Sequence, residues 1–115
     1  MKIIVSGLHL KEFPQIEQYA KKKLIKLAKY NSKIEQIHAR LISEKSHRGQ
    51  DNDYYCEIEV VIPQHNLEIV DTERAMDKAI DKAVERMKRL LIKSKERQIS
   101  RFHKIGILNK LRNRF

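Results

Sequence analysis

Residues 71–97 have the sequence DTERAMDKAIDKAVERMKRLLIKSKER, and this stretch decides the fold because its apolar residues recur at helical spacing. Drawn at about 100° per residue, they fall on one stripe, which is typical of an amphipathic helix that packs against another layer. The stripe consists of Met76, Ile80, Ala83, Val84, Met87, Leu90 and Leu91. We therefore predict a long helix from residue 71 to about residue 97.

The charged residues of the same helix are sorted by sign. One flank carries Lys78, Lys82, Arg86, Arg89 and Lys93, and the other carries Asp77, Asp81 and Glu85. Like charges four residues apart on a helix repel by about 0.2–0.5 kcal/mol per pair, so the sorting gives up a little stability. A helix built only for solubility would intersperse its signs. The sorting predicts a basic ridge that binds a polyanion.

The residues before this helix predict a strand, a first helix and three more strands. Apolar periodicity indicates a strand at 3–6, a helix from Pro14 to about residue 30, and strands at 34–44, 54–62 and 67–70. Residues 46–53 are wholly polar around Gly49 and predict a hairpin connection. Asp71 or Thr72 is expected to cap the second helix by accepting hydrogen bonds from its free backbone N–H groups.

The order β-α-β-β-β-α, with three consecutive strands joined by turns, indicates an antiparallel meander. Each predicted strand has one apolar face, so both helices should pack on that face. The expected fold class is α+β, a two-layer sandwich of a four-stranded sheet with two helices on one face. The opposite face of the sheet should remain wet, and it carries His38, Arg40, Tyr55, Glu57 and Glu59. We divide the chain into a domain at residues 1–96 and a basic amphipathic C-terminal tail at residues 97–115.

Composition narrows the possible partners. The chain has 115 residues, with 25 Lys and Arg against 15 Asp and Glu, which gives a net charge of +10. This balance favours nucleic acid first and an anionic membrane second. No apolar run approaches the length of a membrane span, and the N-terminus does not resemble a signal peptide. We expect a cytoplasmic protein without stable membrane association.

The first predicted helix has basic residues of its own. Lys22, Lys26 and Lys29 share one flank, and Lys23 lies at the apolar border. A lysine-rich helix face is often only a solvated surface, but two basic helices on one sheet face can form a surface that follows phosphates. The residues expected to bind the phosphates of a nucleic acid are Lys22, Lys23, Lys26, Lys29, Lys78, Lys82, Arg86, Arg89 and Lys93.

The sequence gives little support for catalysis, a cofactor, a small-molecule substrate or a metal. The five histidines are scattered over different predicted elements, and none pairs at metal-ligand spacing. The single cysteine, Cys56, lies at an inward strand position and is expected to be an inert core thiol. Phosphate-binding glycine loops and nucleophile motifs are absent from the sequence. We therefore expect a binding protein, not an enzyme.

Four segments resemble one known family in the same order along the chain. Residues 3–7, IIVSG, are similar to its first strand and glycine, and residues 19–27, YAKKKLIKL, are similar to its first helix. Ile62-Pro63 followed by Leu67 resembles its turn before the last strand, and residues 75–82, AMDKAIDK, resemble its second helix. The chain thus resembles the ribosome hibernation-promoting factors, also called ribosome-associated inhibitor A or sigma-54 modulation proteins, in their short form.

The resemblance implies a fold like that of double-stranded RNA-binding domains and a role on the ribosome. Members bind the small ribosomal subunit and its 16S-type rRNA in the channel for mRNA and the A- and P-site tRNAs, and so silence idle ribosomes. By position, Lys22, Lys23 and Lys26 match the family's first helix, and Lys82 and Arg89 match basic positions of its second. Off the ribosome we expect a monomer.

Two other functions stay open at the level of sequence. A free double-stranded RNA-binding module would use the same basic helices without needing a ribosome. A protein-interaction regulator would instead bind an acidic protein surface. The pair Glu85-Arg86 departs from the family pattern, in which arginine often precedes glutamine, and the tail after residue 96 is unlike a simple short-form end.

Overall fold

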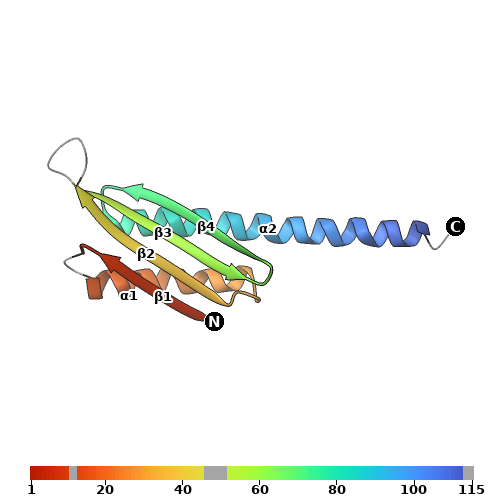
Figure 1. The fold of residues 1–115 in the computed structure, drawn as a ribbon, viewed down its shortest axis with the longest axis horizontal. Coiled ribbons are helices and arrows are strands. Elements are labelled where there is room, and N and C mark those ends of the chain that lie inside the picture. The colour runs from red at the N-terminus through yellow and green to blue at the C-terminus, as the bar shows by residue number, and fades with distance from the viewer. Residues whose placement is uncertain (11–12, 46–51, 113–115) are drawn as a thin grey trace.

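The computed structural model of the protein describes the backbone of residues 1–10, 13–45 and 52–112, and side chains as far as residue 96. The elements are β1 (Lys2–Leu8), α1 (Phe13–Leu24), the 3-10 helix η1 (Ile25–Tyr30), β2 (Gln36–Lys45), β3 (Asn52–Ile62), β4 (His65–Glu73) and α2 (Met76–Arg112). They form two layers, a four-stranded sheet and a layer of helices (Figure 1). The predicted α+β class and element order are confirmed.

The sheet is mixed. Its strands lie in the order β1-β2-β3-β4, with β1 parallel to β2 and the other neighbours antiparallel. Because parallel strands need a crossover, α1 and η1 form the connection that returns the chain from the end of β1 to the start of β2. The parallel pairing therefore places the first helix on the sheet beside α2 (Figure 1).

The core lies between the sheet and the helices. The stripe of α2 is buried at Met76, Ile80, Ala83, Met87 and Leu91, and Val84 and Leu90 pack against it as partly buried residues. From the first helix and the sheet, the largest buried side chains are Leu24, Leu27, Ile37, Leu41, Ile58 and Val60. The predicted stripe of the second helix is thus confirmed.

The last strand and the second helix do not meet where the sequence predicted. β4 runs from His65 to Glu73, and its register with β3 pairs Asp71 with Cys56 and Thr72 with Tyr55. The prediction that Asp71 or Thr72 caps the helix is therefore wrong, and α2 begins at Met76. Asp71 can occupy an inward strand position because its charge is neutralised within the fold, as described below.

Two other boundaries differ. The first helix tightens to a 3-10 helix at Ile25, and the backbone of α2 stays helical to Arg112, well past the predicted end near residue 97. This extension continues beyond the end of the sheet at the turn between β3 and β4, and it gives the molecule a longest dimension of 70 Å (Figure 1). Of the connection predicted at 46–53, residues 46–51 lie outside the described residues, and residues 52 and 53 belong to β3, which begins at Asn52.

Gly7 is needed for the packing of α1 on β1. A Cβ atom at this position would overlap the ring of Phe13, the first residue of α1, and would crowd Leu10. We expect Gly7→Ala to lower the free energy of unfolding by about 1–3 kcal/mol, the usual cost of overpacking, as measured by urea denaturation. Lys2→Ala, at an exposed position of the same strand, should change it by less than about 0.5 kcal/mol. Equal stability of the Gly7 variant and the wild type would contradict this role.

Candidate nucleic-acid interface

The nine basic residues predicted to bind RNA all lie on the helical layer. α1 with η1 and α2 run side by side along the same face of the sheet (Figure 1). Eight of the nine side chains are exposed, and Lys23 is half-buried. The helical layer is therefore one basic surface, but its charges do not all have the same role.

The acidic flank of α2 faces the first helix. The carboxylate of Asp81 accepts a hydrogen bond of 2.6 Å from the hydroxyl of Tyr19 and lies 3.6 Å from the ammonium of Lys23. That ammonium also lies 5.5 Å from the centre of the Tyr19 ring. This cluster links the two helices, so part of the sorted acidic flank has a structural use.

The bond to Asp81 changes the acid–base chemistry of Tyr19. It raises the pKa of Tyr19 from 10.0 to about 12, with smaller contributions from burial and from the charges of Asp81 and Asp77. A charged phenolate beside the Asp81 carboxylate would repel it and could not donate the hydrogen bond. Tyr19 therefore stays neutral and keeps its bond over the physiological pH range.

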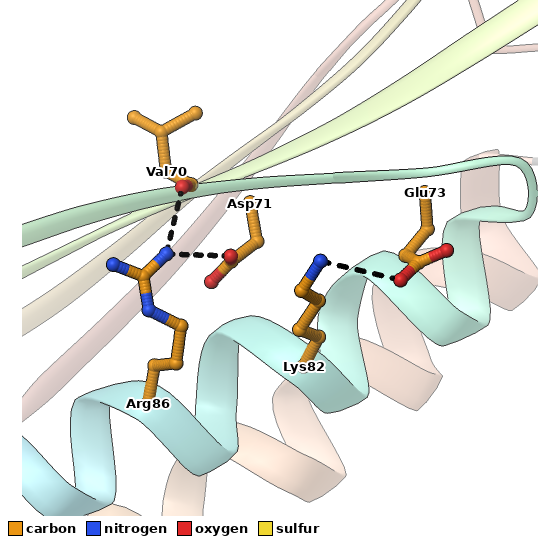
Figure 2. A network of polar contacts seen from close by, with 5 residues as sticks. All are labelled: Val70, Asp71, Glu73, Lys82 and Arg86. Carbon is orange, nitrogen blue, oxygen red and sulfur yellow. Dashed lines mark hydrogen bonds and ion pairs between the residues drawn. The ribbon is translucent and has the colours of Figure 1, made fainter.

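The basic flank of α2 faces strand β4. The guanidinium of Arg86 lies 2.6 Å from a carboxylate oxygen of Asp71 and donates a hydrogen bond of 3.2 Å to the backbone carbonyl of Val70 (Figure 2). Farther along the helix, the ammonium of Lys82 lies 3.3 Å from Glu73 (Figure 2). Two residues of the predicted ridge thus bind the edge strand of their own sheet.

Arg86 neutralises a carboxylate that water does not reach. The side chain of Asp71 is only 4% exposed, and its Oδ2 has no hydrogen-bond partner among the described residues. A buried carboxylate is costly unless it is paired, so removal of Arg86 would leave an uncompensated charge. The structure assigns Arg86 a stabilising role, in addition to any contact with a partner.

Five of the nine residues form no ion pair with a carboxylate in the described part of the chain. They are Lys22, Lys26, Lys29, Lys78 and Lys93, and all five are exposed. Arg89 lies 3.7 Å from Glu85, but both side chains are largely exposed, so this pair contributes little and can be exchanged for another anion. These residues give the helical layer its free positive charge.

Tyr30, at the end of η1, brings lysines from both helices together. The ammonium groups of Lys29 and Lys88 lie 5.3 and 5.7 Å from the centre of its ring. Lys88 was not among the predicted residues. Lys88 follows Asp81 by two helical turns, so it lies on the side of α2 that meets the first helix. This spacing could have identified it from the sequence.

The outer face of the sheet has the opposite character. Arg40 lies 3.9 Å from Glu57, and His38 and Ser6 are within hydrogen-bond distance at 3.1 Å. The pKa of Glu68 is raised because it shares a hydrogen bond with Glu59, directly across the strands. Carboxylates on this face would repel RNA phosphates, so the helical layer is the candidate nucleic-acid interface.

Other sites for chemistry are not evident in the described residues. They contain no group of three or more His, Cys, Asp or Glu residues arranged to hold a metal ion. Burial raises the pKa of the Cys56 thiol to about 12, so little of the nucleophilic thiolate is present. Among the helices that the structure describes, none has the length and apolar character required to cross a membrane.

A family model described as Sigma 54 modulation protein / S30EA ribosomal protein matches residues 3–99. The chain belongs to this family. The family predicted from the four sequence segments is thereby confirmed. A comparison with curated protein sequences gives no match.

Solved structures agree in fold with this family member. A ribosomal subunit interface protein from Coxiella burnetii superposes with a TM-score of 0.71 at 20% identity, over 84% of this chain and 99% of that chain. The N-terminal domain of Protein Y from Thermus thermophilus superposes with a TM-score of 0.63 at 24% identity, over 81% of this chain and 98% of that chain. At these identities the likeness shows the shared fold.

The different roles of Arg86 and Lys78 can be tested by stability. We expect Arg86→Ala to lower the free energy of unfolding by about 1–3 kcal/mol, because the buried Asp71 and the Val70 carbonyl lose their donor. Lys78→Ala, which removes an exposed lysine of the same flank, should change it by less than about 0.5 kcal/mol. Urea denaturation of the wild type and both variants measures these differences in the free energy of unfolding. Equal losses would contradict the structural role of Arg86.

The bond between Tyr19 and Asp81 predicts a dependence of stability on alkaline pH. Folding raises the pKa, so the stabilisation is fully present below pH 10.0 and is lost as the pH rises toward 12. The ultraviolet titration difference between the wild type and Tyr19→Phe should therefore show one tyrosine that ionises near pH 12. Asp81→Asn should move this ionisation to lower pH. Titration of Tyr19 near pH 10.0 in the wild type would contradict the bond.

Proposed function

We propose that this protein binds the small ribosomal subunit in the channel for mRNA and the A- and P-site tRNAs, and thereby inactivates idle ribosomes. The observation that carries the proposal is the free positive charge of the helical layer in a member of this ribosome-associated family. The solved relative from Coxiella burnetii is named for a ribosomal subunit interface, which supports the same setting. Such a role would place the protein in the cytoplasm.

The distribution of charge supports contact with rRNA phosphates. Lys22, Lys26 and Lys29 on the first helix, and Lys78 and Lys93 on α2, are exposed and unpaired within the described residues. Lysine ammonium groups bind phosphate as point charges and do not need a particular base sequence. The proposed contact therefore depends on backbone and shape, and these five lysines are its first candidates. Lys23, Lys82 and Arg89 would contribute after exchange of their exposed carboxylate partners. Arg86 is half exposed and would contact phosphate while it keeps its ion pair with Asp71.

The proposed mechanism is steric and needs no chemistry or cofactor. A basic two-layer wedge with its helices toward rRNA would occupy the space that mRNA and tRNA require. The family is one of ribosome-associated factors and not a class of enzymes. In this proposal residues 1–96 form the ribosome-binding domain and residues 97–115 are an additional segment.

Charge reversal on the helical layer tests the interface. We expect Lys22→Glu with Lys26→Glu, and separately Lys78→Glu with Lys93→Glu, to reduce cosedimentation with purified small subunits about tenfold or more. Removal of phosphate contacts should also reduce the salt slope of binding by about 1 per lysine. Lys2→Glu with Lys33→Glu is the matched control, because both lysines are exposed and lie outside the helices. The control should bind like the wild type.

The site on the ribosome is tested by competition. mRNA together with tRNA should displace the bound wild-type protein, because they require the same channel. Binding that resists this competition, or equal loss in the control variant, would reject the proposed site. Equal or tighter binding to isolated duplex RNA would favour the free double-stranded RNA-binding module instead.

A further inference from the structure

The outer face of the sheet, away from both helices, exposes apolar side chains. Leu8 is 52% and Val70 is 53% exposed. Val70 lines a shallow hollow of about 250 Å³ together with Ile42, Glu44, Tyr55 and Glu57. Exposed apolar side chains around a hollow mark a surface that can bind another chain.

Carboxylates extend this surface toward the other end of the sheet. Glu59 lies directly opposite Glu68 in the pairing of β3 with β4, and Glu57 follows on the same face of β3. A partner must therefore offer apolar side chains for the hollow and positive charge for these carboxylates. RNA does not fit this description, because its phosphates would be repelled.

The C-terminal segment of the chain has the required composition. Residues 97–115 contain Arg97, Arg101, Lys104, Lys110, Arg112 and Arg114 among isoleucine, leucine and phenylalanine, and they contain no acidic residue. At the end of the sheet His65 lies 3.1 Å from Ser94 of α2, and the helix then continues beyond the sheet to Arg112 (Figure 1). The sheet of the same chain therefore does not cover this part of the helix.

In place of the monomer expected from the sequence, we propose that two copies of the protein associate by each placing residues 97–112 of α2 on the outer sheet face of the other. The helix leaves its own domain on the helical side of the sheet (Figure 1). It cannot reach the outer face of its own sheet without turning back around the edge. The occupant is therefore a second copy.

A two-fold axis in the plane of the sheet makes the exchange reciprocal. Such an axis places the second sheet end to end with the first and turns it over, so its outer face lies on the side along which the first helix projects. The same rotation brings the second helix over the first outer face, and the assembly closes as a dimer. In each copy, residues 97–112 then contact the partner, and the outer sheet face is covered by the helix of the partner.

The lengths of the two surfaces agree. Residues 97–112 span about 24 Å as an α-helix. Along β3, the distance from Val61 to Tyr55 is about 20 Å, which covers Glu59 and Glu57 and reaches the hollow. Residues 97–112 are therefore long enough as a helix to pass the carboxylates of β3 and to reach the apolar hollow.

The experiment is sedimentation velocity of the full chain, without ribosomes, over a range of protein concentrations at low and high salt. The apparent mass of the wild type should rise from 13.7 kDa toward twice that value as concentration increases, and high salt should weaken the association. Glu59→Lys with Glu68→Lys should raise the dissociation constant about tenfold or more, and so should Arg101→Glu with Lys104→Glu. Glu85→Lys, which reverses an exposed carboxylate on the helical layer, should leave it unchanged.

A charge swap separates a specific contact from damage to the fold. Each double variant alone should associate more weakly than the wild type, but a mixture of the two should form the mixed dimer, because the reversed sheet face and the reversed helix are complementary again. A monomeric wild type at all concentrations would overturn the proposal. Loss in the tail variant without loss in the sheet variant would overturn the outer face as the site. Since no ribosome is present, either result leaves the proposed ribosomal function untouched.

Discussion

Burial of two helical stripes on the same face of one sheet constrains the rest of this molecule. Leu24 and Leu27 from the first helix and η1, and Ile80, Met87 and Leu91 from α2, all require the apolar side of the strands. Both helices must therefore lie side by side on that face, and their polar residues form one continuous surface. The other face of the sheet is left to a different set of side chains, which is why the protein has two surfaces of different chemistry.

The sorted charges of α2 have two causes that sequence alone does not separate. Its acidic flank meets Tyr19 and Lys23 of the first helix, and its basic flank meets carboxylates of β4. Charge sorting on a helix between two different neighbours is therefore partly a requirement of packing. What remains for a partner is the charge that these neighbours do not neutralise, and it is carried by exposed lysines of both helices.

Periodicity predicted the layers well because burial of apolar residues depends on spacing along the chain. It failed at Asp71, since the carboxylate there is neutralised by Arg86, and an ion pair between a strand and a helix leaves no local pattern. The parallel pairing of β1 with β2 was likewise not predicted, because it depends on the crossover and not on the strands themselves. At the candidate interface, the basic surface was predicted from the lysines and arginines that share one flank of each predicted helix. The division between paired and unpaired lysines, and the approach of Lys88 to Tyr30, required coordinates.

The separation of charge between the two faces also affects how the protein approaches a partner. The chain carries a net charge of +10, yet carboxylates gather on the outer face of the sheet and free lysines on the helices. In the field of a polyanion such a molecule experiences a torque as well as an attraction, and it turns its helices forward before contact. Oriented encounters of this kind raise the association rate, and the gain falls as ionic strength increases. The layered fold therefore acts on the kinetics of recognition as well as on its final geometry.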